Sequence, residues 1–365
     1  MRVIISGGGT GGHIFPAVSI ANALKEADAS VEILFVGALG KMEMERVPAA
    51  GYKIIGLPVA GLQRSLTPKN LLFPFKLIAS LWKARSVVKS FIPDVVVGVG
   101  GYASGPVLRV ASSQGIPTLI QEQNSYPGIT NKILAKKVST ICVAYPGMER
   151  FFPADKIKLL GNPIRQNLLI LPTREEAAAH FGFDSTKPML FLTGGSLGAR
   201  TLNESFLKHI DTLIKADINI LWQTGKFYHS KVVEAMASYP SDKIKVVDFV
   251  SRMEMAYGLA DLVISRAGAG AIAEIALLGK AAIFVPSPNV TEDHQTKNAM
   301  ALVSVGAAEL VKDIDAIETL VNRALALIKD EAQLSNYKKN VQKFAYPDAA
   351  KVIAAEVRAL ATKKV

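Results

Sequence analysis

The sequence predicts an α/β protein built from two doubly wound domains. Short apolar runs of strand length recur along the whole chain, which is typical of strands in a parallel sheet that helices cover on both faces. Helix-like segments separate these runs, and this alternation is the pattern of a doubly wound fold. The runs are too many for one ordinary open sheet, and 365 residues are enough for two domains.

In the first half of the chain, runs rich in Val, Ile and Leu predict the strands. They are Val3–Ser6, Val31–Val36, Lys53–Leu57, Val95–Val99, Thr118–Gln121 and Thr140–Ala144. Ala17–Glu26 and Leu71–Ser90 have the composition of intervening helices. The stretch from Leu160 to Pro163 is rich in turn formers and follows the last of these strands, so we expect the first domain to span residues 1–162.

The second half of the chain shows the same alternation of strand-like and helix-like segments. The predicted strands are Met189–Thr193, Asn219–Gln223, Lys245–Val250, Leu262–Ser265, Ala281–Val285 and Ala308–Val311. Ala271–Leu278 and Ile317–Lys329 are predicted helices, and a last helix begins at Asp348, whose charge suits a helix N-terminus. We expect a second domain over residues 163–345, followed by the helical segment 346–365.

The charge balance indicates an acidic partner. Lys and Arg number 42 against 31 Asp and Glu, which gives a net charge of +11. Nucleic acid, an anionic membrane or a phosphorylated substrate would each suit this surface. The single cysteine, Cys142, excludes a disulfide framework and a cysteine-based zinc site. Charged residues break the apolar runs, so we expect no spanning helix, and the start of the chain does not resemble a signal peptide.

The loops after the strands carry the candidate chemistry, because doubly wound folds bind ligands at the carboxyl ends of their strands. The first loop, residues 7–13, is glycine-rich and leads into a helix, an arrangement that favours anions. The second strand does not end in the acidic residue of a dinucleotide site, and His13 stands where a phosphate-binding loop needs Lys. We therefore expect no nicotinamide or flavin cofactor. His13 either hydrogen-bonds backbone at the helix start or acts as a general base.

Further polar loops follow later strands. Residues 98–106 form a second glycine-rich loop, and residues 121–124 place four polar side chains after one strand. In the second half, residues 194–200 and 265–274 form small-residue loops, the latter leading to Glu274 in the first turn of a helix. A glycine loop, a helix N-terminus and a carboxylate can together hold a phosphate and a ribose. Asp313 and Asp315 match a metal-binding D-x-D pair, but we interpret them as acids at a helix start and expect no metal site.

A basic, apolar segment stands out because residues 46–93 contain no Asp or Glu. Its apolar residues could cover the sheet, or they could form an exposed patch ringed by cations, as in an interfacial membrane anchor. Nothing else in the chain matches a nucleic-acid-binding module, so we expect a membrane and no nucleic acid. The residues that we expect at an anionic membrane surface are Leu72, Phe73, Phe75, Trp82, Lys76, Lys83 and Arg85.

Together these motifs resemble the MurG family, the UDP-N-acetylglucosamine:lipid I N-acetylglucosaminyltransferases of bacterial peptidoglycan synthesis. The resemblance runs essentially end to end. The segments that carry it are Gly8–Pro16, Gly100–Pro106, Gln121–Asn124, Gly161–Arg165, Gly194–Arg200, Arg266–Glu274 and His294–Ala299.

The resemblance implies a GT-B architecture, in which two Rossmann-like doubly wound domains face a cleft. Residues 1–162 would bind the acceptor and the membrane, residues 163–345 would bind UDP-GlcNAc, and the C-terminal helix would pack on the first domain. The implied enzyme is an inverting, metal-independent transferase without a cofactor that converts lipid I to lipid II for cell-wall growth, cell shape and division. It would be a peripheral protein on the cytoplasmic face of the bacterial inner membrane.

The same resemblance assigns the site residues. The implied substrate-binding residues are Thr10, Gly11, Gly12, Asn124, Arg165, Ser196, Val250, Ala269, Glu274 and Gln295, and the acceptor-side residues are Gly100, Gly101, Tyr102 and Ser104. Our first candidate for the base that deprotonates the acceptor hydroxyl is His13, and our second is Glu122.

Alternative functions from other classes remain open at this point. A glycolipid-forming transferase would use diacylglycerol as acceptor, and a UDP-GlcNAc epimerase would need no acceptor. A non-catalytic membrane-binding protein would have lost the chemistry of the loops.

Overall fold

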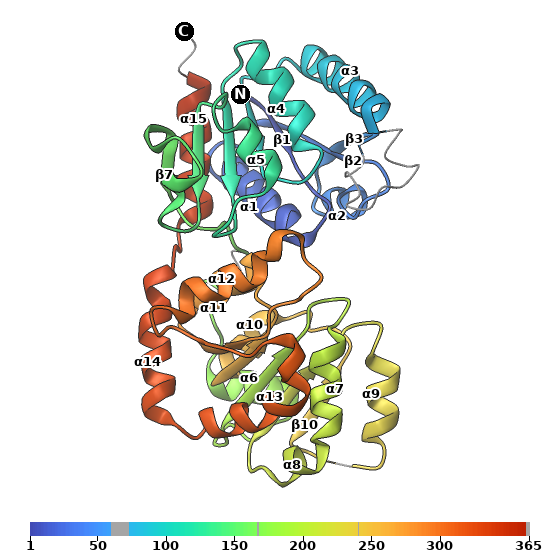
Figure 1. The fold of residues 1–365 in the computed structure, drawn as a ribbon, viewed down its shortest axis with the longest axis vertical. Helices are drawn as coiled ribbons and strands as arrows, with labels where there is room; N and C mark the ends of the chain where they lie inside the picture. The colour runs from blue at the N-terminus through green and yellow to red at the C-terminus, as the bar shows by residue number, and fades with distance from the viewer. Residues whose placement is uncertain (60–72, 166–167, 240, 363–365) are drawn as a thin grey trace. The chain divides into compact units, whose positions relative to one another are not determined.

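The computed structural model describes residues 1–59, 73–165, 168–239 and 241–362, and the chain divides into two compact units (Figure 1). The first unit comprises Met1–Arg165 and Tyr346–Val365, and the second comprises Gln166–Ala345. Within the described residues each unit contains one sheet, and every strand pair in both sheets is parallel. The predicted α/β class with two doubly wound sheets is therefore confirmed.

The sheet of the first unit has the order β3-β2-β1-β4-β5-β6-β7 over the described residues. Its strands are β1 (Arg2–Ser6), β2 (Glu32–Ala38), β3 (Lys53–Leu57), β4 (Val95–Gly98), β5 (Thr118–Glu122), β6 (Thr140–Val143) and β7 (Ile157–Leu159). The central strands are buried on both faces, as their continuous apolar runs require.

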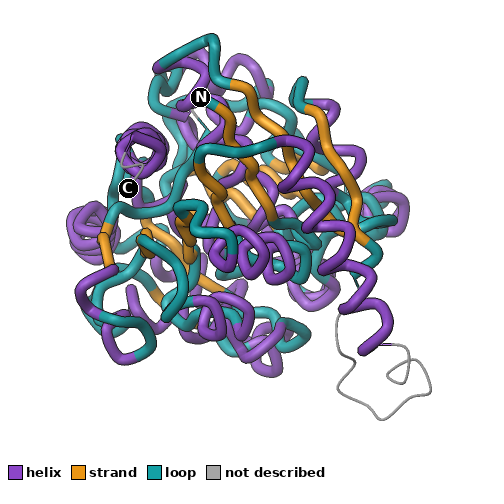
Figure 2. Tube along the Cα trace, turned by 90° about the horizontal axis from the view of Figure 1, so that it is seen from above, coloured by secondary structure: helices purple, strands orange, loops and turns teal. Residues whose placement is uncertain are grey.

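Helices cover both faces of this sheet. They are α1 (Gly11–Ala27), α2 (Glu43–Ala49), α3 (Phe73–Phe91), α4 (Ser104–Ser113), α5 (Ile129–Leu134) and α15 (Ala349–Thr362). Figure 2 shows strands running side by side between helices. The C-terminal helix α15 packs beside α1, and its Ile353 and Val357 are fully buried in one apolar cluster with Val3 and Ile5 of β1. The end of the chain is thus part of the core of the first unit.

Two helices of this unit start differently from the sequence prediction. We expected the first helix to begin at Ala17, but α1 begins at Gly11 and contains Pro16 as a buried residue. Helix α3 begins at Phe73 rather than Leu71, which places Pro74 in its first turn. Proline is tolerated in a first turn because the amide that it lacks would have no partner within the helix there.

The sheet of the second unit has the order β10-β9-β8-β11-β12-β13 over the described residues. Its strands are β8 (Met189–Thr193), β9 (Asn219–Gln223), β10 (Ile244–Val247), β11 (Leu262–Ser265), β12 (Ala281–Phe284) and β13 (Glu309–Leu310). Its helices are α6 (Arg174–Phe181), α7 (Arg200–Lys208), α8 (Ile210–Lys215), α9 (His229–Met236), α10 (Met253–Leu259), α11 (Ala269–Leu277), α12 (His294–Val303), α13 (Asp313–Leu327) and α14 (Glu331–Val341).

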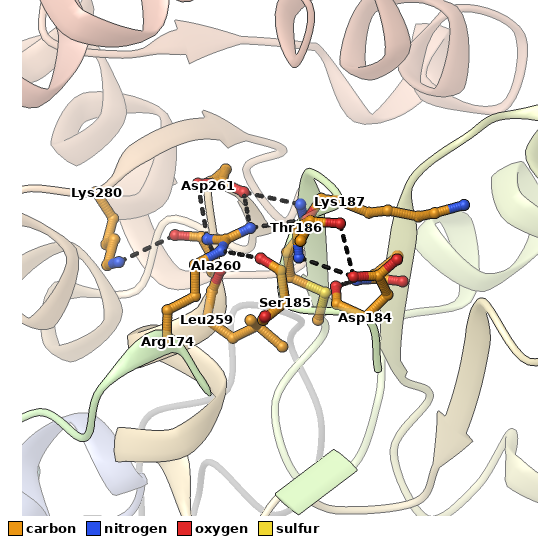
Figure 3. Close-up of polar contacts among 11 residues, drawn as sticks. Arg174, Asp184, Ser185, Thr186, Lys187, Leu259, Ala260, Asp261 and Lys280 are labelled. Atoms are coloured by element: carbon orange, nitrogen blue, oxygen red, sulfur yellow. Dashed lines mark hydrogen bonds and ion pairs between the residues drawn. The ribbon is translucent and has the colours of Figure 1, made fainter. Parts of the chain in front are cut away.

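Arg174 ties the amino-terminal edge of this second sheet together (Figure 3). Its guanidinium donates to both carboxylate oxygens of Asp261, which precedes β11, at 3.2 and 2.9 Å. It also donates to the carbonyl oxygens of Ser185, Lys187 and Leu259. Nearby, Lys280 donates to the carbonyl of Ala260, and burial lowers the pKa of its ammonium group to about 8 (Figure 3). This edge is therefore a structural anchor, opposite the loops that follow the strands.

Candidate functional site

The two sheets share a strand order that creates a switch point in each unit. In β3-β2-β1-β4 and in β10-β9-β8-β11, the winding reverses beside the first strand of the unit. Ligands of doubly wound folds bind outside the carboxyl ends of the strands at such a point. The relevant loops follow β1 and β4 in the first unit, and β8 and β11 in the second.

His13 lies in the first turn of α1, directly after the glycine loop that follows β1. Its Nδ1 atom is 2.9 Å from Oε1 of Gln123. The Gln123 amide nitrogen donates to the carbonyls of Val99 and Gln121, at 2.9 and 3.0 Å, so its Oε1 is the atom that faces the imidazole. Because Oε1 can only accept, neutral His13 carries its hydrogen on Nδ1 and its lone pair on Nε2. This hydrogen bond therefore selects the tautomer in which Nε2 is the basic atom.

Two glycines after β4 allow the imidazole and the first glycine loop to lie close to the backbone. Gly100 has a φ of 95°, and a Cβ there would lie 2.8 Å from Cε1 of His13. A Cβ at Gly101 would lie against the carbonyl oxygen of Gly8, at a distance that real side chains do not show. The loops after β1 and β4 can therefore pack against each other only if these positions have no side chain.

The second candidate base, Glu122, is buried and extensively hydrogen-bonded. Oε1 accepts from the backbone and side-chain amides of Asn124, at 3.0 and 3.1 Å. Oε2 accepts from the backbone amide of Gly128 at 3.1 Å and from the side-chain amide of Asn131 at 2.8 Å. Only 1% of the residue is exposed. The carboxylate thus orders the segment from Asn124 to Asn131, and both of its oxygens are already engaged.

Glu43 is a site residue that our sequence reasoning missed. Its carboxylate is buried and accepts hydrogen bonds from the amides of Gly9 at 2.8 Å and Ala38 at 2.9 Å. It also lies against Gly8, where a Cβ would meet it. We expected the glycine loop to bind an external anion, but the Gly9 amide already donates to the Glu43 carboxylate. The sequence does place this glutamate shortly after the second predicted strand, in the region where a dinucleotide site would carry its acidic ribose ligand.

The other predicted residues of the first unit lie at the same end of its sheet. Thr10 is the exposed N-cap of α1, and Gly11 and Gly12 form the start of that helix. Tyr102 is exposed, and the Ser104 hydroxyl donates to the carbonyl of Gly101 at 2.9 Å. Arg165, which the sequence placed in the second domain, is the last residue of the first unit before the chain leaves it.

In the second unit, the loop after β8 depends on a close contact between two glycines. Gly198 and Gly225 have φ values of 85° and 79°. A Cβ on Gly225 would overlap the backbone of Gly198, and a Cβ on Gly198 would overlap the carbonyl oxygen of Thr224. Ser196 is exposed on this loop, and its carbonyl accepts from the amide of Lys226 at 3.1 Å. The loop is thereby held against the residues that follow β9.

The loop after β11 leads into α11 and to Glu274. Gly268 is the N-cap of α11, and Ala269 is its first residue. Glu274 is buried, and its Oε2 accepts from the hydroxyl of Tyr257 at 3.1 Å. We expected Glu274 in the first turn, but α11 begins before Ala271, so Glu274 lies one turn further along. The Tyr257 hydroxyl therefore orients the Glu274 carboxylate, and the N-terminus of the helix does not.

Two further predicted residues of this unit are engaged in internal hydrogen bonds. The Val250 amide donates to Oε1 of Gln223 at 3.0 Å, and the Gln295 side-chain oxygen accepts from the Ser287 amide at 2.8 Å. These contacts fix both residues beside the ends of β9 and β12.

Helix α3 carries the predicted basic, apolar patch. Phe75 and Trp82 are 71% and 77% exposed, and Ile78 between them is 54% exposed. Their spacing puts them on one face of the helix, while Ala84, Val87 and Val88 are buried on another. Lys76, Lys83 and Arg85 are exposed beside them. Leu72 and the side chain of Phe73 lie outside the described residues.

Over the described ranges, no group of three or more His, Cys, Asp or Glu side chains is placed to hold a metal ion. No helix in those ranges is both long and apolar enough to cross a membrane. Burial raises the pKa of the Cys142 thiol to about 12, so this residue is not a nucleophile near neutral pH.

Comparisons with known proteins cover nearly the whole chain. Residues 3–143 match the glycosyltransferase family 28 N-terminal domain, and residues 189–353 match the glycosyltransferase family 28 C-terminal domain. A protein of Bacteroides fragilis, named UDP-N-acetylglucosamine--N-acetylmuramyl-(pentapeptide) pyrophosphoryl-undecaprenol N-acetylglucosamine transferase, is 56% identical over 364 residues, which are 99% of this chain and 96% of that protein. A protein of the same name from Bacteroides thetaiotaomicron is 55% identical over 364 residues, with 99% and 98% covered.

A solved structure agrees with these matches. The crystal structure of Acinetobacter baumannii MurG is similar with a TM-score of 0.82 and 30% sequence identity. The similarity covers 98% of this chain and 99% of that one.

Proposed function

The chain belongs to the MurG family within glycosyltransferase family 28, and from this premise we infer that it transfers N-acetylglucosamine from UDP-GlcNAc to lipid I, which yields lipid II. The observation that carries this inference is the identity of more than half of the residues, over the whole chain, with relatives whose name states this donor and this acceptor. Because this identity of 56% extends over 364 residues, it favours this transferase over an epimerase or a diacylglycerol-dependent enzyme.

We propose that the switch point of the second unit binds the donor. The buried Glu274 carboxylate, oriented by Tyr257, suits the ribose hydroxyls, which are hydrogen-bond donors. The start of α11 at Ala269 and the loop that carries Ser196 offer backbone amides to the diphosphate. The Val250 amide already donates to Gln223, so the uracil base of the donor would contact other backbone groups there. Gln295, together with Thr10, Gly11, Gly12, Asn124 and Arg165, completes the proposed set of substrate contacts.

We propose His13 as the base and assign a supporting role to Glu122. The Gln123 contact leaves Nε2 of His13 as the proton acceptor, whereas the Glu122 oxygens already accept from several amides. His13 would remove the proton from the muramoyl 4-hydroxyl as that oxygen attacks C1 of the sugar. The bond from C1 to the diphosphate breaks on the opposite face, so the configuration inverts. UDP departs with the electron pair, and helix N-termini and loop amides stabilise its charge.

We propose that the loop after β4 forms the acceptor side of the site. Gly100 lies against the His13 imidazole and Gly101 lies against Gly8, and Tyr102 and Ser104 follow these glycines in the chain. Because His13 has to meet the acceptor hydroxyl, the residues beside its imidazole are those best placed to contact lipid I.

We propose that the exposed face of α3 contacts the membrane that holds the lipid acceptor. Phe75, Ile78 and Trp82 present an aromatic and aliphatic surface, and the neighbouring Lys76, Lys83 and Arg85 suit anionic headgroups. The protein would then be peripheral, on the cytoplasmic face of the inner membrane, without a nucleic-acid partner.

The function is tested by UDP release from UDP-GlcNAc with and without a short-chain lipid I analogue, in the presence of EDTA. Release only with the analogue is expected. Release without any acceptor would instead indicate an epimerase or hydrolase, and release with diacylglycerol in place of lipid I would indicate a glycolipid synthase. Activity that requires added magnesium would contradict metal-independent transfer.

The membrane contact is tested by sedimentation with vesicles that contain phosphatidylglycerol. Trp82→Glu should reduce binding about tenfold or more, since it removes aromatic burial and adds a repelled charge. Ile170→Glu is the matched control, because Ile170 is 84% exposed on the second unit. Equal binding by both variants would contradict the proposed surface.

A further inference from the structure

Asp313 is a charged residue that the sequence suggested either as a metal ligand or as a helix-start acid. It is the first residue of α13, which follows β13 in the second unit. Its Oδ1 accepts from Nη1 of Arg266 at 2.5 Å, and its Oδ2 accepts from the Thr201 hydroxyl at 2.9 Å. Both partners lie far away in sequence, so the carboxylate connects separate loops instead of serving only its own helix.

The two partners of Asp313 are attached to the loops at the switch point. Arg266 directly follows β11 and precedes the Gly268–Ala269 start of α11. Thr201 lies in the first turn of α7, directly after the glycine loop that follows β8. A single carboxylate therefore joins the two loops to which we assign the donor diphosphate.

Arg266 extends this connection to a third strand. The same Nη1 atom donates to the carbonyls of Val285 and Pro286, at 2.9 and 3.2 Å, where β12 ends. Among the described residues, every hydrogen bond that the structure gives this guanidinium uses Nη1. The Nε and Nη2 groups thus keep their donors for another anion, and Asp313 fixes the plane in which they lie.

Asp313 is not needed to dock α13 against α7. Other pairs join the two helices and the residue after α7: Ser205 with the Ala316 carbonyl, Lys208 with Glu318, and His209 with the Ile317 carbonyl. Asp313 and Arg266 have only 21% and 15% of their side chains exposed, so their ion pair is partly desolvated. What Asp313 adds to the helix packing is the link to Arg266.

We propose that Asp313 is a positioning residue for the donor: it holds Arg266 and the start of α7 in the arrangement that receives the diphosphate of a UDP-sugar. This inference rests on the proposed function, since it assumes a nucleotide diphosphate at the switch point of the second unit. The residue acts through Arg266 and Thr201 and does not itself touch the reacting atoms.

The test compares Asp313→Asn with Asp315→Asn in the full-length protein. Asp315 lies on the same helix and is exposed, and its hydrogen bonds to the described residues use its backbone amide and carbonyl and not its carboxylate, so its variant removes the same charge without the link. The asparagine at 313 can accept from only one of the two partners. We expect the KM for UDP-GlcNAc and the Kd for UDP to rise about tenfold to 100-fold in Asp313→Asn, with the KM for the lipid I analogue unchanged. In Asp315→Asn, the KM for UDP-GlcNAc and the Kd for UDP should stay within about twofold of the wild-type values.

Two further variants make the result decisive. Thr201→Val removes one donor and should raise the Kd for UDP several-fold, and Asp313→Glu, which keeps the charge, should recover part of the loss. Trp222 is buried in the second unit, so its fluorescence reports whether the variants remain folded. If Asp313→Asn unfolds, the Thr201→Val result decides the question.

The proposal is overturned if folded Asp313→Asn binds UDP as tightly as Asp315→Asn, or if it loses only kcat. It is also overturned if the UDP affinity of the wild type needs magnesium and Asp313→Asn abolishes that requirement, since Asp313 would then be a metal ligand. UDP binding is measured separately from transfer. A wild type that binds UDP but does not react with lipid I would refute the proposed function and leave this comparison valid.

Discussion

The variant Glu122→Gln distinguishes a structural role of the Glu122 carboxylate from a catalytic one. The side chain accepts four hydrogen bonds, two on each oxygen. A glutamine has one oxygen and one amide nitrogen, so either the Asn124 donors or the Gly128 and Asn131 donors would face an NH₂ group. Two bonds to a charged acceptor are then lost, and each contributes about 1.5–3 kcal/mol. The expected loss of stability in the first unit is about 3–6 kcal/mol.

The assay is hydrogen exchange followed by mass spectrometry, with urea unfolding as a second measurement. Peptides that cover residues 118–131 should exchange much faster in Glu122→Gln, because either the Asn124 amide or the Gly128 amide loses its acceptor. Peptides that cover β9 in the second unit provide the internal reference. Glu149→Gln is the matched control, since Glu149 is an exposed glutamate of the first unit.

The opposite result would refute this reasoning. If Glu122→Gln keeps its exchange pattern and its unfolding free energy to within about 1 kcal/mol, while kcat falls by about 10²–10⁴, then Glu122 is the base. The carboxylate would then have to leave its amide partners during the reaction.

Three more predictions follow from individual contacts. His13→Asn should keep the hydrogen bond to Gln123, because its amide nitrogen replaces Nδ1, yet kcat should fall about 10²–10⁴ as Nε2 is lost, as measured by UDP release. Tyr257→Phe removes the hydroxyl that donates to Glu274 and should raise the KM for UDP-GlcNAc about tenfold with a smaller change in kcat. Burial lowers the pKa of Lys280 from 10.5 to about 8, so the folded state releases this proton before the unfolded state does. The unfolding free energy of the wild type should therefore rise relative to Lys280→Met between pH 8 and 10.5, by up to about 3 kcal/mol, in urea titrations at several pH values.

Each of these predictions has a result that would contradict it. For His13→Asn it is turnover within a few-fold of the wild type. For Tyr257→Phe it is an unchanged KM for the donor. For Lys280→Met it is a stability difference from the wild type that does not vary over this pH range, since an ordinary lysine pKa would give no slope there.

The sequence alone determined most of the strands and their arrangement in two sheets. Continuous runs such as Val95–Val99 and Leu262–Ser265 must be buried on both faces, and parallel strands between helices satisfy that requirement. It missed β7, because Ile157–Leu159 is short and lies at the sheet edge. It also extended β10 to Val250, whose amide instead bonds to the Gln223 side chain.

The sequence also located the loops of the site, because chain order and the switch-point rule assign them to the carboxyl ends of particular strands. The partners of the charged and polar side chains in those loops followed only from the tertiary structure. Glu43 meets Gly9 across 34 positions, His13 meets Gln123 across 110, and Thr201 meets Asp313 across 112. Local composition predicts which segments become strands and helices. A hydrogen bond between distant segments exists only once packing has brought them within about 3 Å, so the tautomer of His13 and the role of Asp313 were decided by the fold.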